Sequence, residues 1–463
     1  MKLEDLRADF KGTLLKPDDA VHVNGVRLFN RRFQGRPALI AQPSDSEDVA
    51  AAVRFARDNG LAPGILGGGH NPAGSAIADG GLVIDMTRLG AVSVDVTRHM
   101  VTVGGGARWK QVDEATMVHG LATPGGDCCV VGVAGYVLGG GHGMLSRAHG
   151  LGCDNLVAAT LVDAAGDVVR VSETEEPELF WALRGGGNGN FGVVTEMDLR
   201  LRPLSDDLYG GALVWPWAYA GVVVRCFRDL FAGRPTDDLT LAMNLARFPF
   251  PDGEPTVTVY GAHLGGAQAA ERDMAAFRRI GPPMIDIFGP TGYLQMQTLS
   301  EDDITGPGQG LRGLWKGGFV EDDLDDGAIE SIIAAFAAAP SPASRIHFDL
   351  AGGGAIARVD RSATAFWHRR ANFNVEVLAL WRDAADDMAN MDWARWAKAD
   401  LAGPLGGGVY VGYGDPELQD WAAAYYGGNC ERLVAAKRRY DPDNLFRFPQ
   451  GLSEVQGAGH GES

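Results

Sequence analysis

The sequence predicts an α+β protein in two parts: a glycine-rich first part of mixed strands and helices, and a second part built on an antiparallel sheet. Two observations predict this fold. In roughly the first 205 residues, short apolar strands alternate with helices and end in glycine clusters at 67–69, 104–106, 139–143 and 185–192. Beyond that point strands dominate and amphipathic helices interleave with them, which is typical of a sheet with helices on one side.

The first predicted unit is a strand–helix–strand arrangement. Ser44 and Ser46 are expected to cap a helix over 47–60, which carries acids in its first turn and ends at Gly60. A short apolar strand ending at Leu66 runs directly into GGGHN at 67–71, and residues 82–86 form a second strand of the same kind. This spacing predicts a small α/β unit.

The rest of the first part contains alternating short elements. They are a strand at 100–103, a helix at 109–120, a hairpin over 155–170 with its turn at 164–167, a helix at 178–183 and a strand at 191–203. The loop at 187–192 matches the G-x-G-x-x-G dinucleotide motif, but a helix precedes it and a strand follows it. That order is the reverse of a Rossmann unit, so we expect only close approach of the backbone to a ligand there.

The second part is predicted from four strands, at 239–248, 255–264, 344–353 and 372–381, and from helices at 267–280 and 328–339. The acidic stretch EDDLDDG at 321–327 is expected to form the N-terminal end of the second helix, where carboxylates suit the helix dipole. Its spacing is not that of a calcium loop, so no metal site is predicted.

The composition excludes several classes of protein. Hydrophobic residues make up 46% and charged residues 22% of the 463 residues, which indicates a folded, soluble chain. A net charge of −18 without a basic run argues against nucleic acid as a partner. No apolar stretch is long enough for a membrane span, and the first residues lack a secretory region, so a cytoplasmic location is expected. Five cysteines in so long a chain do not indicate a disulfide framework.

Two glycine-rich motifs carry the chemical signal. Leu66 is followed by Gly67, Gly68, Gly69, His70 and Asn71, and successive glycine N–H groups can bind an anion such as phosphate. Standing alone, His70 would more simply be a structural histidine. The second motif, at 126–143, contains Cys128 and Cys129 and continues into LGGGHG. Two cysteines are too few ligands for zinc, and this glycine-rich wall lacks the large side chains of a core.

Together these blocks resemble the berberine bridge enzyme group of FAD-linked oxidases, within the vanillyl-alcohol oxidase superfamily. The matching blocks are GGGHN (67–71), LVIDMTRL (82–89), residues 125–156, residues 178–201 and KRRYDPDNLFRFPQG (437–451). The resemblance implies a PCMH-type FAD-binding domain of two subdomains over 1–205 and a substrate domain over 206–414. A C-terminal segment, 415–463, is expected to return to the FAD-binding domain.

The resemblance also implies a bicovalently bound FAD. His70 and Cys128 would carry the two links, because Gly132 fixes the register of the second motif; Cys129 stands where many relatives have proline. Further contacts with the cofactor are implied for the residues of both glycine motifs and of the strand after the 187–192 loop: Leu66, Gly67, Gly68, Gly69, Asn71, Gly132, Gly135, Gly139, Gly140, Gly192 and Val194.

Four residues are implied in catalysis. Val131 occupies the position thought to control access of O2 to the flavin, and its small side chain favours an oxidase. Tyr413 lies in a block that resembles the base-bearing segment, although Gly412 replaces the usual asparagine. A tyrosine with the ordinary pKa of about 10 is a poor base unless its surroundings lower that pKa. Asn374 and Glu376 lie on one side of the 372–381 strand, and Glu376 is the other candidate base.

The implied reaction is hydride transfer from an alcohol, sugar or natural-product substrate to FAD, with reoxidation by O2 and release of hydrogen peroxide. Three alternatives stay open: a dehydrogenase with another electron acceptor, a flavin-binding protein without turnover, and a pyridine-nucleotide reductase on the same fold. The sequence indicates neither the identity of the small-molecule substrate nor the oligomeric state.

Overall fold

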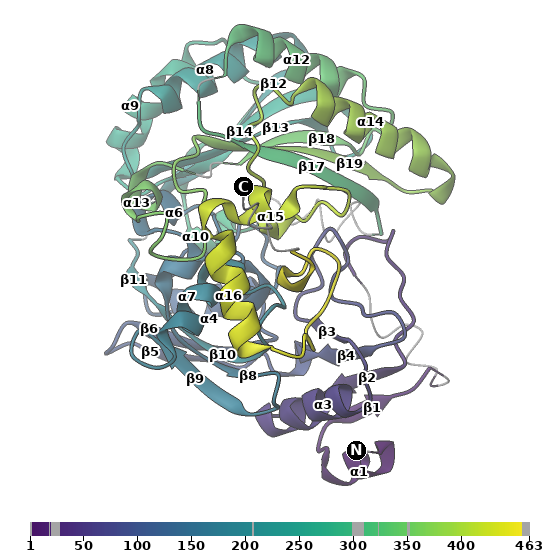
Figure 1. The fold of residues 1–463 in the computed structure, drawn as a ribbon. Helices are drawn as coiled ribbons and strands as arrows, with labels where there is room; N and C mark the ends of the chain where they lie inside the picture. The colour runs from purple at the N-terminus through teal and green to yellow at the C-terminus, as the bar shows by residue number, and fades with distance from the viewer. Residues whose placement is uncertain are drawn as a thin grey trace, which may run out of the picture.

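The computed structural model describes residues 2–17, 19, 28–205, 208–298, 310–322, 324–349 and 352–455. The chain forms two lobes (Figure 1). The first, purple to blue, holds two sheets; the second, teal to green, holds one large sheet with helices on its outer side. The α+β expectation is confirmed.

The first sheet of the first lobe has the strand order β1-β2-β4-β3, and β4 pairs in parallel with both β2 and β3. Its elements are β1 (Thr13–Leu15), β2 (Leu39–Gln42), β3 (Pro63–Leu66), β4 (Leu82–Asp85), and the helices α1 (Leu3–Asp9) and α3 (Ser46–Asp58). The predicted strand–helix–strand unit is therefore confirmed, with apolar side chains of α3 and of β2 and β4 in one core.

The cap of α3 differs from the expected one. The carboxylate of Asp45 accepts a hydrogen bond from the backbone N–H of Asp48 at 3.0 Å, so Asp45 is the N-cap. Ser46 is already the first helical residue, and the hydroxyl of Ser44 donates to the side chain of Asp48 at 2.8 Å. The prediction of a serine cap was therefore wrong, because the capping residue lies between the two predicted serines.

The second sheet is antiparallel, with the order β5-β6-β10-β8-β9. Its strands are β5 (Val92–Asp95), β6 (Met100–Gly104), β8 (Leu156–Val162), β9 (Val168–Ser172) and β10 (Val193–Arg200). The helices in this part of the chain are α4 (Trp109–Met117), α5 (Val133–Leu138), α6 (Ser146–His149) and α7 (Pro177–Gly186). The predicted hairpin is β8–β9. Because α7 precedes the 187–192 loop and β10 follows it, the rejection of a Rossmann unit is confirmed.

The second lobe contains an eight-stranded antiparallel sheet with the order β15-β12-β14-β13-β18-β19-β17, and β16 pairs with β12. The strands are β12 (Leu208–Pro216), β13 (Leu239–Phe248), β14 (Glu254–His263), β15 (Ile285–Asp286), β16 (Gly289–Thr291), β17 (Arg312–Val320), β18 (Arg345–Asp349) and β19 (Phe373–Trp381). All four predicted strands are present, whereas β12, β15, β16 and β17 were not anticipated.

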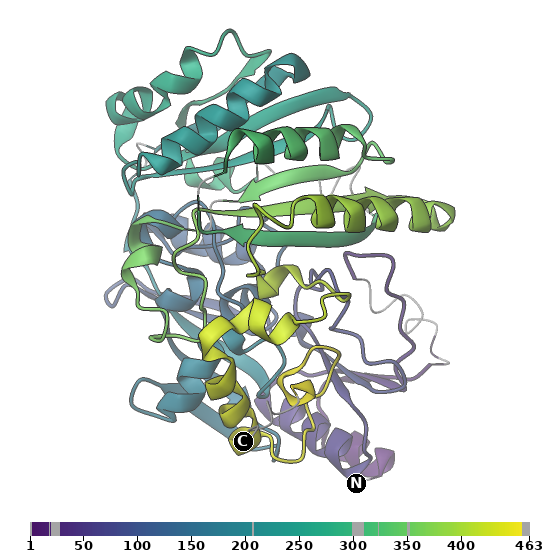
Figure 2. The same cartoon turned by 45° about the horizontal axis from the view of Figure 1, so that its top comes forward.

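Four helices cover one face of this sheet: α8 (Ala220–Ala232), α9 (Gly266–Arg278), α12 (Asp326–Ala337) and α14 (Asp387–Asp400). Figure 2 shows them on the side of the sheet away from the first lobe. The side chain of Asp325 caps α12, so the acidic stretch begins this helix as predicted, although Asp323 lies outside the described residues. Strand β19 shows how the two faces differ. Phe373, Val375 and Val377 enter the core under the helices, so Glu376 and Leu378 face the first lobe.

The C-terminal part of the chain runs back along the first lobe (Figure 1, yellow). It contains α15 (Trp421–Tyr426) and α16 (Cys430–Tyr440), and α16 packs on α7. The Lys437 ammonium donates to the backbone carbonyl of Asn190 at 2.7 Å. The exact domain limits stay predictions, and residue 206 and residues 456–463 lie outside the described residues.

Two kinds of feature are absent from the described residues. No helix there has the length and apolar character to cross a membrane. No group of three or more histidine, cysteine, aspartate or glutamate side chains in the same residues is arranged to hold a metal ion.

Candidate active site

A cavity of about 770 Å³ lies where the two lobes meet, lined by both of them. Its walls come from the loop after β3, the segment from Gly126 to His142, the inner face of the large sheet and two C-terminal stretches near Tyr413 and Phe448. A volume of this size is in the range of cofactor and small-molecule sites.

The two glycine motifs form one wall because their backbones touch. A Cβ atom placed on Gly68 would lie 2.3 Å from the backbone nitrogen of Gly132, and one on Gly132 would lie 2.4 Å from that of Gly68. No side chain fits at either position, since real Cβ atoms do not approach backbone so closely. The motifs predicted to act together are therefore brought together.

His70 and Cys128 line the same cavity. The His70 ring stacks on Phe29 with a centroid separation of 5.2 Å. Burial, reinforced by the positive charge of Arg108, lowers the pKa of His70 to about 4, so its imidazole is neutral. Burial, reinforced by the negative charge of Asp127, raises the pKa of Cys128 to about 12, so its sulfur is a thiol. Cys129 is also buried but is not among the described residues that line the cavity.

Most of the other residues expected to contact a cofactor also line the cavity: Gly67, Gly68, Gly69, Asn71, Gly132, Gly135, Gly192 and Val194. So does Val131, which was expected to control the access of O2. Three lie elsewhere in the described structure. Leu66 packs in a core cluster with Ile40, and close neighbours of Gly139 and Gly140 are the side chains of Asn188 and Phe366. These glycines give room to neighbouring side chains, so the need for a small residue there comes from packing.

Glu376 reaches the cavity from the centre of β19, whereas Asn374, two residues earlier, is buried and does not line it. Burial raises the pKa of Glu376 to about 8, although the nearby Asn374 amide and the positive charge of Lys398 oppose the shift. Neither Glu376 oxygen accepts a well-formed hydrogen bond from the described residues. Glu376 is thus mainly a neutral carboxylic acid at pH 7.

Tyr413 lines the cavity, and its hydroxyl donates to Oδ2 of Asp349 at 3.1 Å. Burial and the negative charge of Asp349 raise the pKa of Tyr413 well above 10. The surroundings therefore act in the direction opposite to the one the sequence argument required. Tyr413 can accept a proton only if Asp349 takes the proton of its hydroxyl.

Asp349 is the centre of a group that the sequence analysis missed. His142 Nδ1 lies 3.0 Å from its Oδ2, and His347 Nε2 lies 3.8 Å from its Oδ1. Burial acts to raise the pKa of Asp349, but the positive charges of the two nearby histidines hold it well below its ordinary value. The alternation along β18, with polar Arg345, His347 and Asp349 between apolar residues, was the signal that could have found it.

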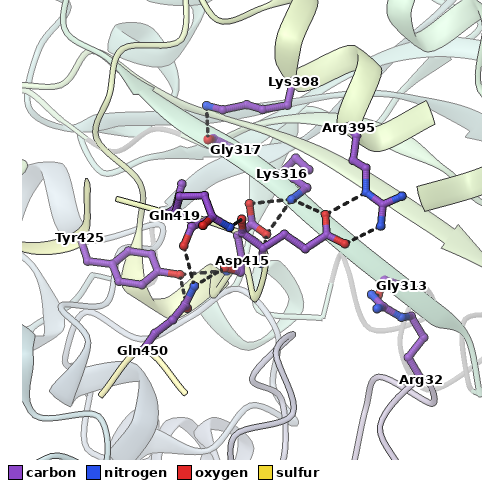
Figure 3. Close-up of polar contacts among 12 residues, drawn as sticks. Arg32, Gly313, Lys316, Gly317, Arg395, Lys398, Asp415, Gln419, Tyr425 and Gln450 are labelled. Atoms are coloured by element: carbon purple, nitrogen blue, oxygen red, sulfur yellow. Dashed lines mark hydrogen bonds and ion pairs between the residues drawn. The ribbon is translucent and has the colours of Figure 1, made fainter. Parts of the chain in front are cut away.

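An ion-pair network holds the segment that carries Tyr413 (Figure 3). The buried Lys316 of β17 donates to both oxygens of Asp415, at 2.8 and 2.9 Å, and lies 2.9 Å from Glu417 Oε2. Arg395 of α14 donates to both oxygens of Glu417, at 2.6 and 3.0 Å. Because Asp415 follows Tyr413 by two residues, these contacts attach the Tyr413 segment to the large sheet and its outer helices.

Two family models match the chain: an FAD binding domain over residues 37–172, and the berberine and berberine-like family over residues 409–453. Among curated proteins, (R)-6-hydroxynicotine oxidase of Paenarthrobacter nicotinovorans is 32% identical over 458 residues, covering 94% of this chain and 95% of that protein. Xylooligosaccharide oxidase of Thermothelomyces thermophilus is 28% identical, covering 92% and 89%.

Solved structures give the same relationship. The crystal structure of 6-hydroxy-D-nicotine oxidase from Arthrobacter nicotinovorans superposes with a TM-score of 0.86 at 32% identity, covering 95% of this chain and 97% of that one. BBE-like 1 of Physcomitrella patens superposes with a TM-score of 0.89 at 24% identity, covering 98% and 99%, which shows that the fold is shared.

Proposed function

The chain belongs to the berberine bridge enzyme-like family of FAD-linked oxidoreductases, and on that premise we propose that it is an oxidase whose FAD is bound covalently at both His70 and Cys128. The single observation that carries this proposal is that both side chains line one cavity beside the paired glycine motifs. A neutral imidazole has a lone pair free to bond to carbon, which suits His70 as an attachment point. Cys128, and not its neighbour Cys129, is the cysteine that lines the cavity.

The residues present fit a flavin. Contact between the backbones of Gly68 and Gly132 leaves no space for side chains in the wall, so peptide groups rather than side chains face the cavity there. A bound flavin would supply an acceptor for the hydride of the substrate carbon and, with O2 as the final oxidant, would release hydrogen peroxide. The small side chain of Val131 lines the cavity, and we expect it to leave room for O2.

Tyr413 and Asp349 supply the base in this proposal. The substrate hydroxyl gives its proton to the Tyr413 oxygen while the Tyr413 proton moves to Asp349 Oδ2, over the existing 3.1 Å hydrogen bond. This coupled transfer avoids a free phenolate, which the raised pKa of Tyr413 disfavours. Glu376 is protonated at neutral pH and can donate a hydrogen bond to the substrate, so it is the weaker candidate for the base.

The substrate class proposed is a small molecule with an oxidisable carbon, such as an alcohol, a sugar or a natural product. Two relatives are named for the oxidation of 6-hydroxynicotine and of xylooligosaccharides. The aromatic side chains of Phe29, Tyr260 and Trp315 line the cavity and offer flat apolar surfaces for a ring.

Two measurements test the proposal. The intact mass under denaturing conditions should exceed the mass of the chain by one FAD, and a panel of alcohols, sugars and aromatic natural products should contain a substrate that yields peroxide in air. An unmodified mass from yellow protein would contradict the covalent attachment. Turnover only with an artificial electron acceptor would favour a dehydrogenase instead.

A further inference from the structure

We propose that His142, acting through Asp349, is the final acceptor of the proton that the substrate hydroxyl gives to Tyr413. His142 does not touch the substrate in this scheme and is a positioning residue. The inference rests on the proposed role of Tyr413 and Asp349, and it adds where the proton ends and what makes the pair ready to receive it.

His142 and Tyr413 both face the same carboxylate oxygen, Oδ2 of Asp349. His142 Nδ1 lies 3.0 Å from Asp349 Oδ2, and the hydroxyl of Tyr413 donates to the same oxygen at 3.1 Å. The His142 side chain is only 2% exposed. The centroid of its ring lies 4.7 Å from that of Tyr410 and 6.0 Å from that of Tyr413, whose ring is perpendicular to it. These contacts fix the orientation of the imidazole. A proton arriving on Oδ2 from one side therefore faces an imidazole nitrogen on the other.

The groups around His142 come from both lobes. Asp349 of β18 and Asp127 of the glycine wall are the carboxylates, Tyr410 and Tyr413 are the neighbouring hydroxyl groups, and His347 lies beyond Asp349. Burial acts to lower the pKa of His142, but the negative charge of Asp349, 3.0 Å away and helped by Asp127, outweighs it and raises that pKa above its ordinary 6.5. The imidazole therefore holds its proton to a higher pH than an ordinary histidine does.

Three proton transfers connect the substrate hydroxyl to His142. With His142 neutral and its ring proton on Nε2, the Nδ1 nitrogen is the acceptor. The substrate hydroxyl proton moves to Tyr413, the Tyr413 proton moves to Asp349 Oδ2, and the proton on Oδ2 moves to His142 Nδ1. The products are a substrate alkoxide ready to lose hydride and an imidazolium–carboxylate pair between His142 and Asp349. With His142 already protonated, Asp349 is held as a weak acceptor and the transfer is blocked. The neutral form is the one that supports the reaction.

Histidine NMR on the holoenzyme tests the pairing without any substrate. With histidine labelled at Cε1, the His142 signal is identified by its loss in His142→Asn and is then titrated. We expect a midpoint above 6.5 in the wild type and a lower midpoint in Asp349→Asn, because the carboxylate that favours the imidazolium is gone. The matched control is His263, a buried histidine 3.1 Å from Asp273, whose signal should not respond to Asp349→Asn.

The outcomes separate this inference from the proposed function. A His142 midpoint at or below 6.5, or one unchanged in Asp349→Asn, overturns the inference whether or not a substrate is known. If His142→Asn does not fold, His142→Gln identifies the signal instead. A raised, Asp349-dependent midpoint supports the inference, and failure of every compound to yield peroxide would then count against the proposed function alone.

Kinetics supply the second readout. With a substrate that yields peroxide, the rate of anaerobic flavin bleaching should rise with pH through the midpoint found by NMR. His142→Asn should remove this rise and, above the midpoint, lower the rate by roughly the 10²-fold typical of a lost proton acceptor. Full covalent FAD in the variant, by mass, controls for damage to the site. A rise that persists at the same midpoint in His142→Asn would overturn the assignment.

Discussion

Replacing Glu376 with glutamine separates the two candidate bases. Burial raises the pKa of Glu376 to about 8, so at pH 7 about nine in ten molecules carry it as a neutral acid. Glutamine matches that acid in size and charge. We therefore expect Glu376→Gln to change the rate of substrate oxidation at pH 7 by less than about tenfold, against the roughly 10²–10⁴-fold loss typical of a removed base.

The assay is anaerobic stopped-flow bleaching of the flavin, which reports substrate oxidation without the step that consumes O2. Tyr413→Phe is the matched variant, because it deletes the hydroxyl that donates to Asp349 and keeps the ring. Its rate should fall by roughly 10²–10⁴-fold. The assignment would be refuted by the reverse result, a large loss in Glu376→Gln at pH 7 with a normal rate in Tyr413→Phe.

The same variant should change how stability depends on pH. Glu376 holds its proton in the folded state up to about pH 8, whereas in the unfolded chain it releases the proton near 4.5. The folded state therefore loses stability as the pH rises from 4.5 to 8, by about 5 kcal/mol in total. Glu376→Gln removes this loss, so its melting temperature relative to wild type should increase between pH 5 and 8. A constant difference would show that Glu376 is already ionised in the fold.

Further substitutions test which cysteine binds the flavin, whether Val131 controls the access of O2, and how much the Lys316 ion pair contributes to stability. Cys129→Ala should keep both covalent links, whereas Cys128→Ala should keep one; peptide mapping that finds flavin on Cys129 would show that the register is wrong. Val131→Leu should slow reoxidation by O2 and spare flavin reduction, because the packed wall has little room for added volume; equal reoxidation rates would place the oxygen path elsewhere. Lys316→Met leaves Asp415 buried without its cation and should cost roughly 3–5 kcal/mol in denaturant unfolding, while Lys11→Met, at an exposed pair, should leave the stability almost unchanged.

The elements that the sequence predicted well are those with a strong local pattern. The amphipathic helices and the strands β13, β14 and β19 were found within a few residues of their observed ends. Strand β17 was missed because nearly all its residues are buried and it contains Gly313, Gly317 and Gly318, so it shows neither alternation nor high strand propensity. Strand β19 is equally buried, but its phenylalanine, valines and leucines give it the strand propensity that β17 lacks.

The site residues likewise fall into those that the sequence could identify and those that it could not. His70 and Cys128 could be singled out because each lies in a contiguous motif. Asp349 and His142 could not be paired, since they are far apart in the chain and meet only where the two lobes close on each other. The neighbours that raise the pKa of Tyr413 also come from distant segments, so the sequence could not show the direction of its shift.

Two carboxylates on neighbouring strands show why the surroundings, and not the residue type, assign the chemical role. In the register of β18 and β19, Glu376 pairs with His347 and Asp349 pairs with Asn374, so both acids belong to one small area of sheet. Glu376 has no well-formed donor among the described residues and keeps its proton, whereas Asp349 faces His142, His347 and Tyr413 and stays ionised. A pair of acids whose surroundings push their pKa values apart is suited to act as donor and acceptor respectively. Asp349 is therefore the residue through which a base must work, and Glu376 the one that can donate to the substrate.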